Sequence, residues 1–168
     1  RGHRATPATT DSATTDTHVT PAKGDTVGPQ LTEVSHTGEL IPELAESFES
    51  DDAQKWVFNL RQGVEFHNGK TMTSEDVVAS YNHHMGEDST SAAKGLLTQV
   101  KSLKADGKNK VIFELENPNA DFPFIVSDYH ISIRPAGDRA SGVGTGGYIL
   151  QSFEPGVKSV LKKNPNYW

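Results

Sequence analysis

The chain has 168 residues, of which 34% are hydrophobic, and it carries a formal net charge of −6. This length suffices for one domain of ordinary size, and the lean hydrophobic content predicts a small core with much surface and loop. The acidic balance argues against binding to nucleic acid or to anionic lipid, which attract a basic surface. Because the chain has no cysteine, disulfides, thiolate metal sites and cysteine nucleophiles are excluded.

The first 30 residues differ from the rest in composition. They contain eight threonines and three prolines but few large apolar side chains. This predicts loop or disorder, with one short edge strand at Ala5 to Thr9. No apolar run approaches the roughly 20 residues that span a bilayer. The chain does not open on a charged and then apolar signal peptide, so we expect a mature form.

The region from residue 31 to residue 69 predicts short strands joined by turns. The alternation of Trp56, Phe58 and Leu60 places these three side chains on one face of a strand. Asn68-Gly69 is a strong turn signal. We expect a strand at residues 31–34, a turn at 36–39, a short helical or irregular segment at 40–48 and the clearest strand at 55–60.

Two helices are expected next. Thr73 and Asp76 have the spacing of a capping box, and an apolar stripe that includes Val77 and Tyr81 then predicts a helix from Ser74 to about Met85. The rest of this region predicts a second helix at residues 91–104, a strand at 110–116, a single helical turn at 121–126 and a strand at 129–133.

Residues 134–147 are rich in glycine, and we interpret them as a crossing between domains. Tyr148 to Phe153 and Val157 to Lys162 then predict a hairpin around Glu154-Pro155-Gly156. Short strands mixed with a few helices predict an α+β fold, with a mixed or antiparallel sheet on which the helices pack.

Several segments, taken in their order and spacing, resemble one protein family. They are Gly38-Glu-Leu-Ile-Pro-Glu-Leu-Ala-Glu-Ser-Phe-Glu49, Trp56-Val-Phe-Asn-Leu-Arg-Gln-Gly-Val-Glu-Phe-His-Asn-Gly-Lys-Thr-Met-Thr-Ser-Glu-Asp-Val77, Gly144-Thr-Gly-Gly-Tyr148, Glu154-Pro-Gly156 and Lys163-Asn-Pro-Asn-Tyr-Trp168. They resemble family 5 of the bacterial extracytoplasmic solute-binding proteins, which serve ABC importers of peptides and oligopeptides. The resemblance covers residues 36–168 well and 1–35 poorly.

The resemblance implies part of a bilobal fold of the periplasmic-binding-protein type, in which two lobes close on a ligand by hinge motion. Residues 1–36 would begin the hinge-bearing first lobe, residues 37–133 would form a small extra α+β domain, and residues 134–168 would cross and return to the first lobe. Members of the family continue for several hundred residues past the segment that ends at Trp168. We therefore expect the second lobe to be absent from this chain, and with it a complete ligand cleft.

In the intact protein, the resemblance implies non-covalent capture of a small solute, most commonly an oligopeptide, and delivery of this solute to an ABC permease. It further implies a periplasmic or extracytoplasmic location, no enzymatic activity, no cofactor and no span across the membrane. An alternative is a stand-alone interaction fragment that self-associates through exposed sheet edges.

The candidate ligand-binding residues lie where the predicted small domain meets the crossing, a junction that would open onto the cleft. They are Ser127, Asp128, Tyr129 and His130. Because neighbours on a strand alternate faces, these residues cannot form a catalytic triad by themselves. The candidate hinge residues share the freedom of glycine to turn the backbone between lobes. They are Gly144, Gly146 and Gly147.

Three histidines and one loop could suggest other sites, but their positions do not fit them. His83 and His84 are adjacent on a helix and point about 100° apart, so they do not converge on a metal. His67 lies in a turn with no carboxylate spaced to complete a ligand set. Residues 142–147 look like a phosphate loop, but they lack its Lys-Ser/Thr pair and no helix follows. We expect neither a metal site nor a nucleotide site.

Overall fold

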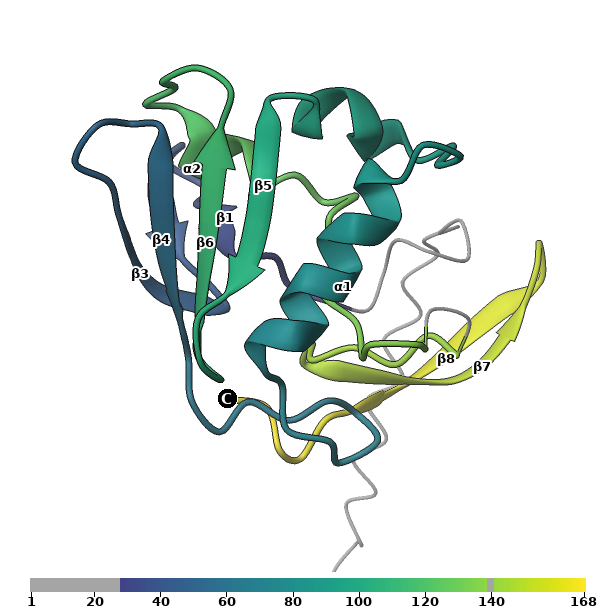
Figure 1. The fold of residues 1–168 in the computed structure, drawn as a ribbon. Coiled ribbons are helices and arrows are strands. Elements are labelled where there is room, and N and C mark those ends of the chain that lie inside the picture. The colour runs from purple at the N-terminus through teal and green to yellow at the C-terminus, as the bar shows by residue number, and fades with distance from the viewer. Residues whose placement is uncertain (1–27, 139–140) are drawn as a thin grey trace, which may run out of the picture.

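Figure 1 shows a computed structural model of the chain, which describes residues 28–138 and 141–168. The strand expected at Ala5 to Thr9 lies outside the described residues. In chain order the elements are β1 (Thr32–Val34), β2 (Leu40–Pro42), β3 (Ala45–Glu49), β4 (Lys55–Leu60), α1 (Ser74–Met85), the 3-10 helix η1 (Ala92–Leu97), β5 (Val100–Ala105), β6 (Lys110–Leu115), α2 (Phe122–Ile125), β7 (Tyr148–Glu154) and β8 (Lys158–Lys163). The predicted α+β class is confirmed.

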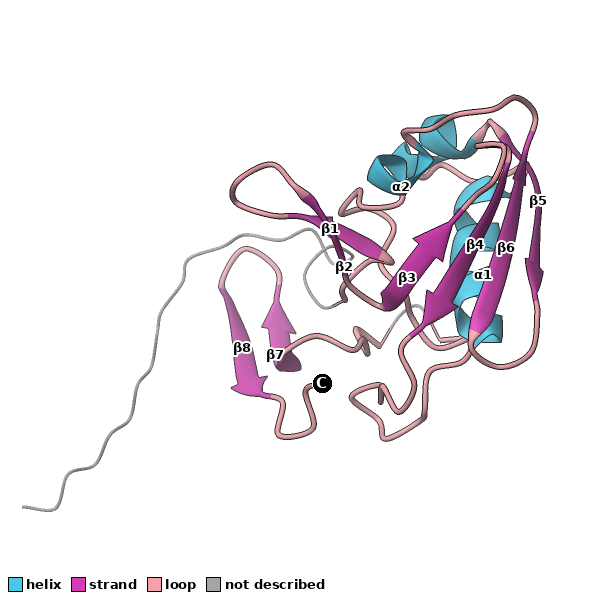
Figure 2. Ribbon diagram, turned by 90° about the vertical axis from the view of Figure 1, so that its left-hand side faces the viewer, coloured by secondary structure: helices cyan, strands magenta, loops and turns pink. Residues whose placement is uncertain are grey.

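An antiparallel sheet with the strand order β3-β4-β6-β5 occupies the centre of the described chain. Its strand β4 coincides with the strand predicted at residues 55–60 and pairs on one side with β3 and on the other with β6. Helix α1 lies across one face of this sheet (Figures 1 and 2). The predicted alternation is confirmed, because Phe58 and Leu60 are buried on the face that α1 covers, whereas Lys55 is exposed.

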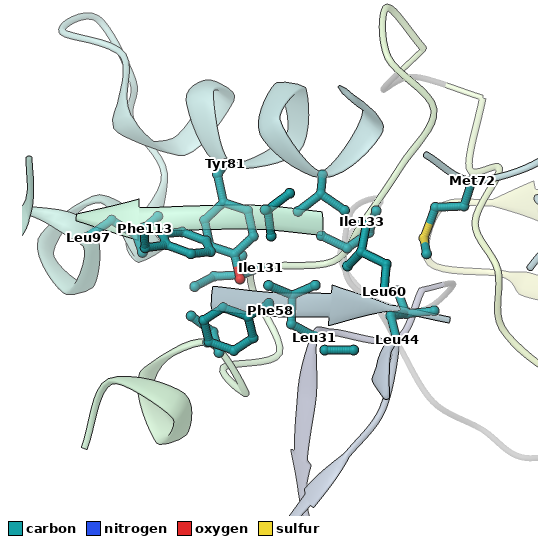
Figure 3. Packing of buried hydrophobic residues seen from close by; sticks show 14 of the residues in the cluster. Leu31, Leu44, Phe58, Leu60, Met72, Tyr81, Leu97, Phe113, Ile131 and Ile133 are labelled. Atoms are coloured by element: carbon teal, nitrogen blue, oxygen red, sulfur yellow. The ribbon is translucent and has the colours of Figure 1, made fainter. Parts of the chain in front are cut away.

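The core between the sheet and α1 is built around aromatic rings (Figure 3). Tyr81 of α1 meets Phe113 of β6 edge to face, with ring centroids 5.0 Å apart, and Phe113 meets Phe58 of β4 at 5.4 Å. Such a ring contact stabilises by roughly 0.5–1.5 kcal/mol beyond its area burial. Leu31 and Ile133 bury their side chains in the same cluster. The core therefore includes Leu31, which lies before the predicted boundary at residue 36.

The capping box predicted at the start of α1 is present. The Asp76 carboxylate accepts hydrogen bonds from the backbone N–H groups of Thr73 (2.9 Å) and Ala136 (2.8 Å), and it pairs with the Lys70 ammonium. Burial raises the pKa of Asp76, but the hydrogen bonds from Lys70, Ala136 and Thr73 outweigh burial and hold this pKa below its usual value. Asp76 thereby fastens the beginning of α1 to the loop that follows residue 133.

The prediction of a helix over residues 91–104 is wrong. The first part of this segment is the short η1, and the second part is β5, an edge strand that pairs with β6. The spacing of Leu97, Val100 and Leu103 suits a helix locally. Gly95 weakens that helix by up to about 1 kcal/mol relative to alanine, and pairing with β6 satisfies the backbone of both strands.

The structure also differs from expectation at residues 40–48 and 129–133. The first segment contains β2 and β3 instead of a helical or irregular stretch, because β1 and β4 each offer it an edge to pair with. Pro42 lies at the end of the edge strand β2, where a missing N–H interrupts little of the ladder. Tyr129 and His130 form a turn in which the Asp128 side chain accepts the N–H of His130, and no strand of the described chain pairs with residues 129–133.

The predicted C-terminal hairpin is confirmed as β7 and β8. These strands pair antiparallel from Tyr148 opposite Lys163 to Glu154 opposite Lys158. The hairpin lies apart from the central sheet (Figure 2), and every residue of β8 is exposed. The residues that join the central sheet to this hairpin include the glycine-rich crossing.

Candidate functional site

The four candidate ligand-binding residues form one short loop after α2. The Ser127 hydroxyl donates to the backbone carbonyl of Phe124 at 2.6 Å and so completes the end of α2. Asp128 Oδ1 accepts the backbone N–H of His130 at 2.9 Å and lies 2.7 Å from His130 Nδ1. Because a carboxylate only accepts, Nδ1 carries a proton, and Asp128 fixes the orientation of the imidazole ring.

Tyr129 is the most exposed of these four residues, with 60% of its surface accessible. Its ring lies on that of His130, with the centroids 3.9 Å apart and the planes inclined by 33°. We call Asp128, Tyr129 and His130 the 128–130 surface. It offers ring faces, which stack on apolar or cationic groups, beside a carboxylate that attracts positive charge. The structure thus brings three of the predicted residues together, while Ser127 bonds back to α2.

The three candidate hinge glycines lie in the crossing that leads into β7, and the chain bends at residues 145–147. The Gly144 carbonyl accepts the backbone N–H of His67 at 2.8 Å. On the other side, Asn164 donates its side-chain amide to the Gly146 carbonyl at 3.1 Å and its backbone N–H to the Gly147 carbonyl at 2.8 Å. The crossing is therefore hydrogen-bonded both to the turn that contains His67 and to the segment that follows β8.

Two carboxyl groups, those of Glu33 in β1 and Glu43 after β2, lie near the aromatic residues at the C-terminal end. Burial raises the pKa of Glu43 to about 7, and a hydrogen bond to Glu33 and the negative charge of Glu33 act in the same direction. The positive charge of Arg61 opposes this rise. Burial and the charges of Glu43 and Glu33 also raise the pKa of Tyr167. The Arg61 guanidinium stacks 4.9 Å above the centre of the Trp168 ring, beside a cavity of about 330 Å³.

The adjacent histidines of α1 take part in packing. The rings of His83 and His84 are 5.3 Å apart and inclined by 78°, and His84 Nδ1 lies 2.6 Å from the Ser91 hydroxyl that begins η1. Within residues 28–138 and 141–168, no three His, Asp or Glu side chains gather closely enough to hold a metal ion. No helix in these same ranges is both long enough and apolar enough to cross a bilayer.

Residues 39–168 match the family described as bacterial extracellular solute-binding proteins, family 5 Middle. The match covers more than half of the chain, so the chain belongs to this family, as the motifs around Trp56 and Tyr148 predicted. The chain spans about a quarter of the length of curated relatives that it matches.

Solved structures of binding proteins share the fold. AgaA from Agrobacterium tumefaciens R10, in complex with agropinic acid, is 27% identical with a TM-score of 0.79, and the match covers 84% of this chain and 30% of AgaA. A nickel ABC transporter protein from Bacillus halodurans is 31% identical with a TM-score of 0.76, over 87% of this chain and 31% of its own. The described chain is therefore part of a bilobal periplasmic-binding-protein fold.

A third structure is a periplasmic binding protein, DppA from Helicobacter pylori, in complex with a peptide. It is 24% identical with a TM-score of 0.74, and the match covers 84% of this chain and 34% of that protein. At this level of identity the likeness concerns the fold alone.

Sequence reasoning missed His67 and Asn164 as the residues that hold the glycine crossing. His67 lies 77 positions before Gly144, and its turn gives no sign of the partner. The one available signal is general: a glycine-rich backbone has polar groups but no side chains, so it needs partners from elsewhere. That signal does not indicate which residue provides them.

Proposed function

We propose that the chain is part of the substrate-binding component of an ABC importer, which captures an oligopeptide or a similar solute and delivers it to a membrane permease. The match of residues 39–168 to family 5 carries this proposal. The protein acts in the periplasm or its extracytoplasmic equivalent, without covalent chemistry and without a cofactor. Its small domain lies at residues 37–133, between the two parts of the first lobe.

The 128–130 surface supports a role in ligand contact. A peptide carries a positive amino group and apolar side chains, which suit the carboxylate of Asp128 and the exposed ring of Tyr129. The Asp128 contact holds the His130 ring in place, so Tyr129 stacks on a fixed partner. In this proposal Ser127 to His130 line one wall of the cleft, and the second lobe provides the opposite wall.

Calorimetric titration tests the proposal on the protein as its own cells produce it. The probes are a set of short peptides, agropinic acid and chelated Ni²⁺. We expect a peptide to bind and Tyr129→Ala to weaken it about tenfold, the scale of one well-placed aromatic contact. Tyr148→Ala is the matched control, because Tyr148 is 59% exposed on β7.

The other outcomes are equally informative. Binding of Ni²⁺ or agropinic acid without any peptide binding would overturn the assignment to peptides while leaving solute capture intact. Equal affinity in the two tyrosine variants would overturn the role of the 128–130 surface. Hydrolysis of a peptide during the titration would contradict a purely binding function.

A second candidate function is self-association through exposed sheet edges. The observation that favours it is β8, an edge strand in which Val160 and Leu161 are 38% and 44% exposed. Light scattering over a range of protein concentrations should then show a dimer or larger species that Leu161→Lys disperses. A monomer at every concentration would exclude this candidate.

A further inference from the structure

His67 connects two segments that are distant in the sequence. Its backbone N–H donates to the Gly144 carbonyl at 2.8 Å. Its ring makes two more contacts with the same crossing: the backbone N–H of Gly144 points at Nδ1 at 3.3 Å, and Nε2 lies 2.9 Å from the Gly146 carbonyl. One residue therefore engages three polar groups of the crossing.

These contacts define the protonation state of the ring. A backbone N–H only donates, so Nδ1 must accept and carries no proton. A carbonyl only accepts, so Nε2 must carry the proton and donate it to the Gly146 oxygen. His67 is therefore neutral and in the Nε2–H tautomer. The other tautomer would set the donor on Nδ1 against the N–H of Gly144.

We propose that His67 is a positioning residue that holds the crossing against the 66–69 turn. The crossing changes conformation only after the ring has released Gly144 and Gly146. Glycine has no side chain with which to anchor itself and has wide backbone freedom, so the order of this segment depends on partners such as His67. Asn164 completes the anchorage from the opposite side.

The His67 ring would also restrain a hinge at these glycines. A hinge at Gly144 to Gly147 that bends during lobe closure must first break the contacts of the His67 ring. This consequence rests on the proposed function, whereas the positioning role of His67 does not. The ring tautomer and the amide exchange of the solute-free chain test the positioning role separately from the proposed function.

The tautomer of His67 is the first measurement. Long-range proton–nitrogen correlation on the ¹⁵N-labelled chain distinguishes the two neutral forms of an imidazole ring. We expect a proton on Nε2 and none on Nδ1. A proton on Nδ1 would overturn the proposal, because the ring could not then accept the Gly144 N–H.

Amide hydrogen exchange in variants is the second measurement. In His67→Ala the Gly144 amide should exchange about three- to tenfold faster, the effect of losing one hydrogen bond of ordinary strength. His67→Asn retains an acceptor near the position of Nδ1 and should keep most of this protection, whereas His67→Gln extends its amide towards the position of Nε2 and should not. His36→Ala, at an exposed turn histidine, is the matched control.

Equal Gly144 exchange in the native chain and all three His67 variants would overturn the proposal. Unchanged protection of the β4 and β6 amides shows that a variant has kept its core. If His67→Ala does not fold, the tautomer measurement and the comparison of His67→Asn with His67→Gln still decide the question.

Discussion

Replacement of Asp76 by alanine should lower the free energy of unfolding by about 3 kcal/mol. The Asp76 side chain is fully buried, and it accepts hydrogen bonds from the backbone N–H groups of Thr73 and Ala136. Alanine leaves both donors without this acceptor at the start of α1. A hydrogen bond to a charged group contributes about 1.5–3 kcal/mol, so losing two, with some relief from water entering the space, gives the stated value.

The ion pair with Lys70 adds less. The Lys70 side chain is 45% exposed, so water screens its charge, and the pair contributes at most about 1 kcal/mol. Domains of this size unfold at about 5–15 kcal/mol. The variant should therefore still fold, but at a clearly lower urea midpoint.

Urea unfolding at pH 7, followed by circular dichroism, measures the difference. Glu75→Ala is the matched control: Glu75 is exposed in the same helical turn, and its loss removes only a helix-dipole interaction of about 0.3–1 kcal/mol.

Because the folded-state pKa of Asp76 is lowered, its stabilisation is present above the unfolded pKa of about 3.9 and disappears as the pH falls through the folded value. The gap to the native chain should narrow in acid. A loss below about 1 kcal/mol at pH 7 would refute this reasoning.

Three further changes test the core and the acidic pair. Tyr81→Phe should stabilise the fold by about 1 kcal/mol in thermal melts, because the buried hydroxyl has no hydrogen-bond partner among the described residues; a lower Tm would contradict this. Phe113→Ala should cost about 3–5 kcal/mol in urea, against almost nothing for Val34→Ala at an exposed strand position. Glu43→Gln should raise the Tm at pH 8 and have little effect at pH 4. The folded-state pKa of Glu43 is about 7, so the native fold loses stability as the pH rises from about 4.3 to 7 and this carboxyl group ionises. An equal effect at both pH values would contradict that cause.

The parts of the fold that were predictable are those with a local physical cause. The helix over Ser74–Met85 was predicted at its full length, because Thr73 and Asp76 cap it and its apolar stripe has helical spacing. The strand at residues 55–60 was equally clear from its alternation. The segment 91–104 was not predictable, because its second half becomes a strand only when β6 offers an edge. No local pattern contains that information.

The candidate site shows the same division. The loop after α2 was located by its place at a predicted junction, but that Asp128 would orient His130 while Ser127 turned back to Phe124 depends on the path of the chain. The contacts of His67 with Gly144 and Gly146 cross more than 70 residues of sequence. They follow from the way in which the crossing returns to the turn that contains His67, which periodicity and composition do not describe.

Native mass spectrometry of the protein as its cells produce it tests the central claim most directly. The spectrum is recorded intact and again after acid has released bound molecules, and then with added short peptides, agropinic acid and chelated Ni²⁺. The proposed function predicts a complex with one small solute, lost in acid and restored by one of the probes. A protein that carries no solute and takes up none of these probes would contradict solute capture as the proposed function.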